Sequence, residues 1–463
     1  MRRTAQTGSE KSPLFVPITV IQNEVISMQV RGDGKVSALL KDIPVPKMFH
    51  AEQIFPAEHL KTEEIPSRVR REMEKKEIRE KIKPGMKIAV TAGSRGIRNV
   101  ALITKSIVGV CREMGAEPFI VPAMGSHGGA TAEGQTEILK GYGITEETMG
   151  CPIRSSMEVV CLGVSETGKE VYFDKMAFEA DGIIISCRIK PHNAFRGSYE
   201  SGPCKMMTVG LGKQKGASLV HADGMERIAA NIPAMAEVVL KNAPVLFAIP
   251  CIENAYDETF MIEAIPAEKI MEREPELLKT AFSRMPRLIV GSCDVLVVDE
   301  IGKNYSGTGV DPNITGTFST EVAHGGIKTG RTAFLRLSPE SHGNALGVGL
   351  SSAITRAIFE EMDPEMMYPN CITSTVLNSA RIPCVMATEK EAVQLCIRTC
   401  NGVKASDVRM VRIPNSLHIG RIMLSENYLA DVRDGKYPGL KALDEPEDLL
   451  FDGEGRIMTP VLL

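Results

Sequence analysis

Three loops that follow short apolar runs contain residue types able to do chemistry. The first holds Ser94 and Arg95 among glycines, and its backbone N–H groups and guanidinium suit a phosphate or a carboxylate. The second presents His127 between glycines, and the third presents His192 after a proline. Because imidazole titrates near neutral pH, two histidines at neighbouring strand ends can remove a proton from one face of a substrate and return it on the other. The pattern therefore indicates an acid/base pair.

A glycine-punctuated stretch after His192 adds a lysine and a third histidine. Lys205, Lys213 and Lys215 lie in this stretch, and His221 follows them. A histidine near a lysine indicates a metal ligand beside a covalent or electrostatic anchor. The alternative is that all three loops are ordinary turns without a role, since their glycines match neither a P-loop nor a dinucleotide-binding motif.

Short, continuous apolar runs predict strands that are buried on both faces, as in a parallel sheet covered by helices. The predicted strands are KIAVT (87–91), PFIV (118–121), GIIISC (182–187), VLFAI (245–249) and DVLVV (294–298). Between the first two, apolar residues recur every three or four positions from 100 to 114, which predicts a helix that ends at Gly115. A similar period over 228–239 precedes the fourth strand. This alternation indicates an α/β fold.

The stretch 258–287 is rich in charge and proline and shows no strand of its own, so we expect a domain boundary near residue 288. The sequence predicts two α/β domains, 1–287 and 288–430, each with a mostly parallel sheet flanked by helices. The acidic tail, 431–463, lacks a sustained apolar period, and we expect it to pack back on the first domain. Ligand sites lie at the carboxyl ends of strands in such sheets, and we expect the active site in the cleft between the domains.

Composition excludes several classes of protein. The chain of 463 residues has 54 Lys and Arg against 58 Asp and Glu and no Trp, which gives no basis for binding nucleic acid or an anionic membrane. No stretch approaches the roughly 20 apolar residues of a membrane helix, and no apolar segment follows the two N-terminal arginines, so we expect a cytoplasmic protein. The 11 cysteines show no CxxC pair, and we expect reduced, mostly buried thiols.

The ordered set of loops resembles the nickel-dependent lactate racemase family over residues 85–350. The family's arginine loop is matched by Ser94-Arg95-Gly96, and its Gly-x-His element by Gly125-Ser126-His127. Its third element, Pro-His and then a glycine-bearing turn with a lysine, is matched by Pro191-His192 and by Gly202-Pro203-Cys204-Lys205, with His221 sixteen residues later. Members of the family carry a nickel-pincer nucleotide, the nickel complex of pyridinium-3,5-bisthiocarboxylic acid mononucleotide.

The resemblance implies roles on the substrate side of the site. Arg95 would hold the substrate carboxylate through a bidentate contact. His127 and His192 would be the two general bases, one for each enantiomer. In the family the second domain supplies a lysine to the substrate, and Lys303 is the candidate in this chain.

The resemblance also implies roles on the cofactor side. Lys205 would carry the nucleotide, covalently in the best-understood relatives, and Ser94 would contact it. His221 would complete the nickel coordination, which suits a roughly planar site. The implied reaction is racemisation or epimerisation of a 2-hydroxy acid by proton-coupled hydride transfer, with a transient 2-keto acid.

Two departures from the family's pattern bear on the substrate. His127 is followed by Gly128-Gly129, and the loop 193–204 is longer than in the lactate enzymes, so lactate is not assumed. Four side chains of this loop either line the pocket, with Arg196 meeting a second anionic group, or belong to a solvated loop: Phe195, Arg196, Tyr199 and Glu200.

Two other functions remain open from the sequence alone. One is a lyase or dehydratase that acts on a sugar acid with a simple divalent ion, and the other is a non-catalytic anion- or nucleotide-binding protein. The expected partners are a small 2-hydroxy acid and the enzymes that synthesise the cofactor, with no nucleic acid and no membrane. The oligomeric state is left open.

Overall fold

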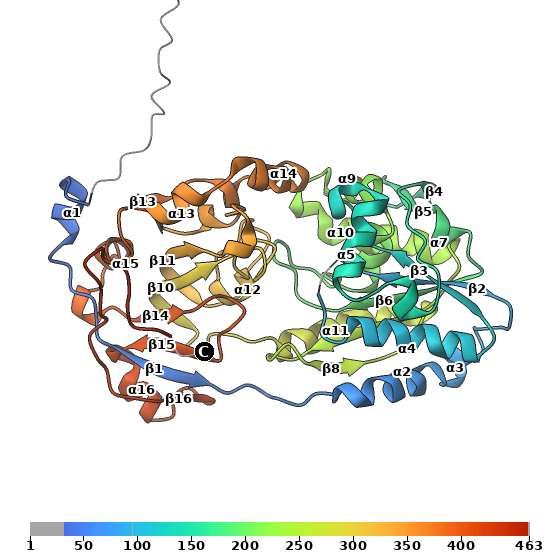
Figure 1. Ribbon diagram of the computed structural model, residues 1–463, viewed down its shortest axis with the longest axis horizontal. Coiled ribbons are helices and arrows are strands. Elements are labelled where there is room, and N and C mark those ends of the chain that lie inside the picture. Colours follow the sequence, from blue (N-terminus) through green and yellow to red (C-terminus); the bar gives the residue numbers. More distant parts are fainter. Residues whose placement is uncertain (1–31, 95, 462–463) are drawn as a thin grey trace, which may run out of the picture.

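Two large β-sheets organise the chain, and helices cover both (Figure 1). The computed structural model describes residues 32–94 and 96–461. The first sheet, which we call the N-terminal sheet, has the strand order β3-β2-β6-β7-β8, and its strands are β2 (Lys87–Ala92), β3 (Glu117–Pro122), β6 (Gly182–Arg188), β7 (Val245–Glu253) and β8 (Thr259–Ile262), with β9 (Ile265–Pro266) paired to β7. The four strands from β3 to β7 are parallel, and β8 and β9 are antiparallel to β7. All four parallel strands were predicted.

Both faces of the N-terminal sheet are buried because its strands are apolar at consecutive positions. On β6, Ile183 and Ile185 belong to one hydrophobic cluster, whereas Ile184 belongs to the cluster on the opposite face. The helices on the Ile184 face are α2 (Ile65–Met73), α3 (Lys76–Arg79), α4 (Val100–Glu113), α5 (Ala132–Gly141) and α6 (Glu146–Met149). Those on the other face are α7 (Lys175–Phe178), α8 (Pro203–Lys205), α9 (Lys213–His221), α10 (Met225–Asn242) and α11 (Ile270–Arg284).

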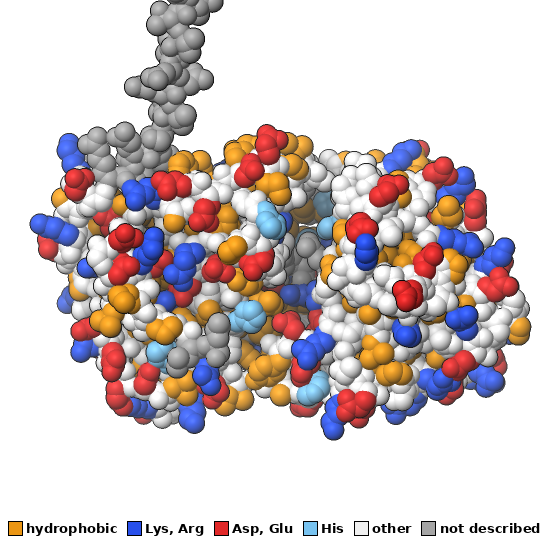
Figure 2. All heavy atoms as spheres, viewed as in Figure 1, with side chains coloured by type: hydrophobic (Ala, Val, Ile, Leu, Met, Phe, Trp, Pro, Cys, Tyr) orange, Lys and Arg blue, Asp and Glu red, His pale blue; other side chains and the backbone are white. Residues whose placement is uncertain are grey.

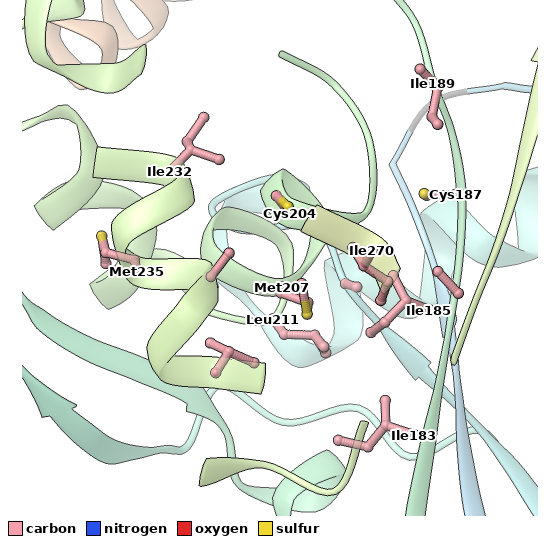
Figure 3. Packing of buried hydrophobic residues seen from close by; sticks show 14 of the residues in the cluster. Ile183, Ile185, Cys187, Ile189, Cys204, Met207, Leu211, Ile232, Met235 and Ile270 are labelled. Carbon is pink, nitrogen blue, oxygen red and sulfur yellow. The ribbon is translucent and has the colours of Figure 1, made fainter. Parts of the chain in front are cut away.

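The segment after α8 lies between β6 and α10. It forms η3 (Met206–Gly210), a short π-helix, and Met207 and Leu211 fill the space between this strand and this helix (Figure 3). Cys204, Met207 and Leu211 are fully buried. Their burial fixes the course of the chain on both sides of Lys205.

The second sheet, which we call the C-terminal sheet, has eight strands in the order β13-β12-β11-β10-β14-β15-β1-β16. They are β1 (Met48–Gln53), β10 (Ser292–Ile301), β11 (Lys328–Leu337), β12 (Ala353–Thr355), β13 (Cys384–Met386), β14 (Met410–Ile413), β15 (Arg421–Ser425) and β16 (Leu440–Ala442). The five strands from β13 to β14 are parallel, and the remaining pairs are antiparallel. The remaining helices are α1 (Lys35–Leu40), α12 (Pro312–Thr315), α13 (Arg356–Glu361), α14 (Pro364–Ser374), α15 (Glu389–Arg398) and α16 (Leu429–Arg433).

The fold is thus a mixed α/β arrangement with two large, mostly parallel sheets flanked by helices, as the sequence predicted. A separate hairpin, β4 (Val159–Val164) and β5 (Glu170–Asp174), lies beside α9 and α10. Within residues 32–94 and 96–461, no helix is long and apolar enough to cross a membrane.

The tail 431–463, which was expected to pack on the first domain, lies on the C-terminal sheet. Its strand β16 pairs with β1 in the C-terminal sheet, and Ile457 packs in the cluster on one face of that sheet. The buried side chains of Arg412 and Glu389 bond the backbone of Thr459 (2.8 Å) and Ile457 (2.7 Å). A tail held by single anchors shows no apolar period, so periodicity does not indicate where it packs.

Two further differences concern where strands lie. Residues 48–53 were placed in the first domain, but they form β1, an inner strand of the C-terminal sheet. The stretch 258–287 was predicted to have no strand, yet it contains β8 and β9 before α11. Both strands are short and lie at one edge of the sheet, where a brief apolar run among charges suffices.

Candidate active site

The arginine loop follows β2 at the carboxyl edge of the N-terminal sheet. The carbonyl oxygen of Ser94 accepts a hydrogen bond from the Tyr142 hydroxyl at 2.8 Å. Farther along the loop, the backbone N–H of Arg98 donates to Glu253 Oε1 at 2.6 Å. These two bonds tie the loop to the end of α5 and to the end of β7. The predicted carboxylate-binding residue Arg95 lies outside the described residues.

His127 lies in the next loop, between β3 and α5, with its side chain exposed. Its Nδ1 is 2.8 Å from the carbonyl oxygen of Met124, which can only accept. Neutral His127 therefore carries its proton on Nδ1, and its Nε2 holds the lone pair that can take a proton. The chain turns sharply at Gly128, with φ of 67°, where an added Cβ would lie 2.5 Å from the backbone of Gly134. Only glycine fits there.

A buried polar network supports the His127 loop from below. Gln135 Nε2 donates to the carbonyl oxygens of Gly125 (2.9 Å) and His127 (3.3 Å). Gln135 Oε1 accepts from Lys213 Nζ at 3.2 Å, and Lys213 also donates to the carbonyl oxygen of Pro122.

The lysine of this network forms a fully buried ion pair. Lys213 Nζ is 3.0 Å from Asp174 Oδ2, and neither side chain is exposed. Burial lowers the pKa of Lys213 and raises that of Asp174, although each charge favours the other. Lys213 also has φ of 53°, a strained conformation for a residue with a side chain. A strained, buried ion pair beneath a histidine loop marks this place as one that the fold must hold rigid.

His192 lies in the loop between β6 and α8, residues 189–202, which we call the His192 loop. The backbone N–H of Ala194 donates to His192 Nδ1 at 3.1 Å, so neutral His192 carries its proton on Nε2. The ring packs on Phe195 with 4.4 Å between centroids. The backbone N–H of His192 donates to Glu200 Oε2 at 2.6 Å.

His221 ends α9 and is half-buried. Its Nδ1 donates to the carbonyl oxygen of Ala217 at 2.7 Å, which leaves the lone pair on Nε2. Burial is the main cause that lowers the pKa of His221, and the positive charge of Lys205 lowers it further. A neutral imidazole whose other nitrogen is fixed by a carbonyl is the form that binds a metal ion.

The structure brings the segments of four predicted residues together. A Cβ on Gly93, beside Ser94, would lie 3.2 Å from Met206, the residue after Lys205. A Cβ on Gly125, in the His127 loop, would meet both the Val209 carbonyl oxygen at 3.1 Å and Ala217 at 3.5 Å. The segments of Ser94, His127, Lys205 and His221 are therefore in direct contact.

His192 is linked to Lys205 through the carboxylate of Glu200. The positive charge of half-buried Lys205 acts on Glu200, whose carboxylate binds the His192 backbone. Burial nevertheless dominates and raises the pKa of Glu200.

Lys303 lies in the connection 302–327 between β10 and β11. Its Nζ donates to the carbonyl oxygen of Gly307 at 2.6 Å and to Asn370 Oδ1 on α14 at 3.0 Å. The His192 loop touches the same connection, because Asn193 Nδ2 donates to Ser306 Oγ at 3.0 Å. Figure 2 shows a hollow between the two halves of this face, with pale blue histidine side chains on both sides.

Sequence reasoning missed the residues that support the site. Gln135 and Asp174 were not singled out, and Lys213 was noted only as one of several lysines in a glycine-rich stretch. A lysine directly after Gly212 at a helix start was the one available signal, and nothing in the sequence pairs it with Asp174.

Comparison with known families gives a match for the N-terminal part of the chain. Residues 32–231 match the family model described as "Lactate racemase N-terminal domain". The described candidates on the N-terminal sheet, from Ser94 to His221, all lie within this match.

Among solved structures, the chain is similar to the lactate racemase apoprotein from Thermoanaerobacterium thermosaccharolyticum. The identity is 12%, the TM-score is 0.41, and the alignment covers 75% of this chain and 85% of that chain. A likeness of this degree carries no argument about function. No curated protein matches the chain.

Proposed function

Because residues 32–231 match the model of the lactate racemase N-terminal domain, we propose that this protein is a racemase or epimerase of a 2-hydroxy acid that works with a nickel-pincer nucleotide. The observation that carries the proposal is the direct contact between the segments of Ser94, His127, Lys205 and His221. Residues that are far apart in the sequence share one edge of the N-terminal sheet, where α/β proteins bind ligands.

The two histidines supply proton transfer. His127 Nε2 accepts the hydroxyl proton of one enantiomer, because its Nδ1 is already protonated and bonded to Met124. His192 Nε2 donates a hydrogen bond to the substrate oxygen in its neutral form, because its Nδ1 accepts from Ala194. For the other enantiomer the two histidines exchange these roles, which requires the proton of His192 to move to Nδ1 and the bond from the Ala194 N–H to break. Arg95 holds the carboxylate and thereby fixes which face of the α-carbon is presented.

The residues of this chain fit the proposed cofactor. Burial lowers the pKa of His221, which favours the neutral ring, and the bond to Ala217 leaves the lone pair on Nε2, as a nickel ligand requires. Lys205 lies close enough to His221 for its charge to act on the imidazole, so Lys205 would hold the nucleotide and His221 would be a ligand of its nickel. When bound, the nickel-pincer nucleotide supplies a reversible acceptor for the α-hydride. Such an acceptor is needed because the α-hydrogen of a hydroxy acid is too weakly acidic to leave as a proton.

We propose a 2-hydroxy acid other than lactate as the preferred substrate. The His192 loop is long, and it docks against the connection 302–327, which carries Lys303. Lys303 is the proposed second contact to the substrate.

An isotope experiment tests the reaction type. The protein would be produced together with the cofactor-synthesis enzymes and incubated with 2-hydroxy acids that carry deuterium at the α-carbon. The proposal predicts that the inverted product keeps its deuterium, because the α-hydrogen moves as hydride and returns to the same carbon. Exchange of the deuterium with solvent would show plain deprotonation and would contradict the proposal. Loss of water to form a 2-keto acid would instead indicate a dehydratase.

A further inference from the structure

We propose that Arg196 is a positioning residue that clamps the His192 loop to the connection 302–327, so that His192 is held in place by the C-terminal half of the molecule. The inference rests on the proposed function only in its last step, the effect on catalysis. The clamp itself follows from the contacts of one guanidinium group. Sequence analysis had left Arg196 either facing a second anionic group of the substrate or lying in a solvated loop.

On one side, the guanidinium group binds the His192 loop itself. Nη1 donates to the carbonyl oxygens of His192 (2.7 Å) and Phe195 (3.0 Å). It also lies 3.3 Å from Glu200 Oε2, the atom that accepts the backbone N–H of His192. Arg196 thus fixes His192 both directly and through Glu200.

On the other side, the same group binds the connection 302–327. Nε donates to the carbonyl oxygen of His324 at 2.8 Å, and Nη2 donates to Asn313 Oδ1. The ring of Phe318 in this connection (5.1 Å) and that of Phe282 on α11 (5.4 Å) lie within cation–π distance of the guanidinium carbon. All three nitrogens of the guanidinium are therefore engaged by the protein.

Further bonds between the same two segments surround the clamp. The backbone N–H of Arg196 donates to the carbonyl oxygen of Val322 at 3.2 Å, and the Thr320 hydroxyl donates to the carbonyl oxygen of Ala194. Below them, Lys190 Nζ lies 3.1 Å from Asp311 Oδ2. The segments dock along several residues, and Arg196 is at the centre.

Burial makes the Arg196 contacts costly to lose. The side chain of Arg196 is 13% exposed and that of Glu200 is 1% exposed. Burial lowers the pKa of Arg196 and raises that of Glu200, so each charge depends on the other for compensation. Lysine would not replace Arg196, because a single ammonium group cannot reach carbonyl oxygens on both segments.

The contacts between the two segments also hold the ring of His192. Its tautomer is set by the N–H of Ala194, and residues 193–196 are held mainly by the connection 302–327. The same connection carries Lys303. Docking of the two segments therefore positions both His192, a candidate base from one half of the molecule, and Lys303, a candidate substrate contact from the other half.

Hydrogen exchange measured by mass spectrometry on the full chain tests the clamp without relying on activity. We expect the peptide 189–202 to exchange at least tenfold faster in both Arg196→Ala and Asn313→Ala, since each removes a bond between the two segments. The matched control is Arg284→Ala, which loses an ion pair with Glu58 (2.8 Å) and a ring contact with Phe260 away from the site. It should leave exchange in 189–202 unchanged. Unchanged exchange in Arg196→Ala and Asn313→Ala would overturn the proposal.

Kinetics of the cofactor-loaded enzyme test the positioning role. We expect kcat in Arg196→Ala to fall roughly 10²-fold with little change in KM, because a displaced His192 impairs the chemical step. Added guanidinium ion should restore part of kcat in Arg196→Ala and nothing in the control. Arg196→Lys, which keeps the charge and the fold, should remain impaired. Faster loop exchange with unchanged kcat would refute the positioning of His192, whereas a wild-type protein without isomerase activity would refute only the proposed function.

Discussion

His127 and His192 use their Nδ1 atoms in opposite ways. His127 Nδ1 donates to the carbonyl oxygen of Met124 at 2.8 Å, whereas His192 Nδ1 accepts the N–H of Ala194 at 3.1 Å. The two neutral rings therefore offer different groups at Nε2, a lone pair on His127 and an N–H on His192. In this state His127 can act as the base, whereas His192 can donate a hydrogen bond and becomes a base only after its proton leaves Nε2.

This relationship predicts unequal effects of glutamine at the two positions. Glutamine can donate a hydrogen bond but cannot take a proton at neutral pH. His127→Gln should lower interconversion by about 10²- to 10⁴-fold. His192→Gln should still convert one enantiomer to the 2-keto acid in a single turnover and should fail with the other.

Rapid-quench analysis of each enantiomer with the loaded enzyme measures these effects. His59→Gln is the control, because His59 Nδ1 makes a similar bond to the carbonyl oxygen of Ala57 outside the site. Equal loss of both enantiomers in His192→Gln would show that the tautomers do not set the direction.

The network below His127 predicts separate effects on stability and activity. Lys213→Met leaves the Asp174 carboxylate buried without its partner, and we expect the free energy of unfolding to fall by about 3–5 kcal/mol. Adding Asp174→Asn removes the buried charge and should restore much of this stability. The double variant should nevertheless stay less active, because the bonds from Lys213 to Pro122 and Gln135 are still missing.

Denaturant unfolding and turnover of the same samples measure this prediction. Gln135→Ala, which removes the contact to the His127 carbonyl oxygen, should reduce activity with a smaller loss of stability. Full activity in the double variant would show that the network has only a structural role.

The sequence predicted the sheets better than the site's supports. Runs such as KIAVT and GIIISC are apolar at consecutive positions, and a strand buried on both faces is the simplest structure for them. The histidines were found because they follow such runs. β8 and the tail were missed because short edge segments are held by neighbours and not by their own pattern.

Arg196 shows why the remainder could not be predicted. A cation in a long loop near a strand end is compatible with a ligand contact, and the sequence left that reading open. Most of its acceptors are backbone carbonyl oxygens of His192, Phe195 and His324, and these carry no signature in the sequence. The same holds for Asp174, which meets Lys213 only because β5 lies beside α9.

Substitution of His221 should lower the nickel content of the protein. His221→Ala removes the imidazole whose Nε2 we assign to nickel and leaves the backbone carbonyl oxygen of Ala217, which orients the ring, in place. We expect the nickel content of the loaded protein, measured by elemental analysis, to fall at least tenfold on dialysis. His59→Gln should retain nickel. Retention by His221→Ala would remove His221 from the coordination.

Glu274 predicts a pH dependence of stability. It is buried in α11, its Oε2 accepts the backbone N–H of Cys204 at 2.8 Å, and its Oε1 has no hydrogen-bond partner. Burial raises the pKa of Glu274 to about 7 from its ordinary 4.5. The folded state therefore holds this proton more tightly than the unfolded state does, and the resulting stability is complete below pH 4.5 and is lost as the pH rises through 7.

Glu274→Gln stays neutral and should lose this contribution to the pH dependence. Relative to the variant, the wild-type protein should lose roughly 3 kcal/mol of unfolding free energy between pH 4.5 and pH 8, at 1.36 kcal/mol per pKa unit. Urea unfolding at several pH values measures the difference. Glu272→Gln, an exposed change on the same helix, is the control. Parallel pH profiles for wild type and Glu274→Gln would contradict the prediction.

The most direct test of the whole account is chiral analysis of a panel of 2-hydroxy acids after incubation with the cofactor-loaded protein. The account predicts that at least one acid is converted to its other configuration at the α-carbon, approaching the same mixture from either side. Failure to interconvert any acid, in a preparation shown to contain nickel, would contradict it.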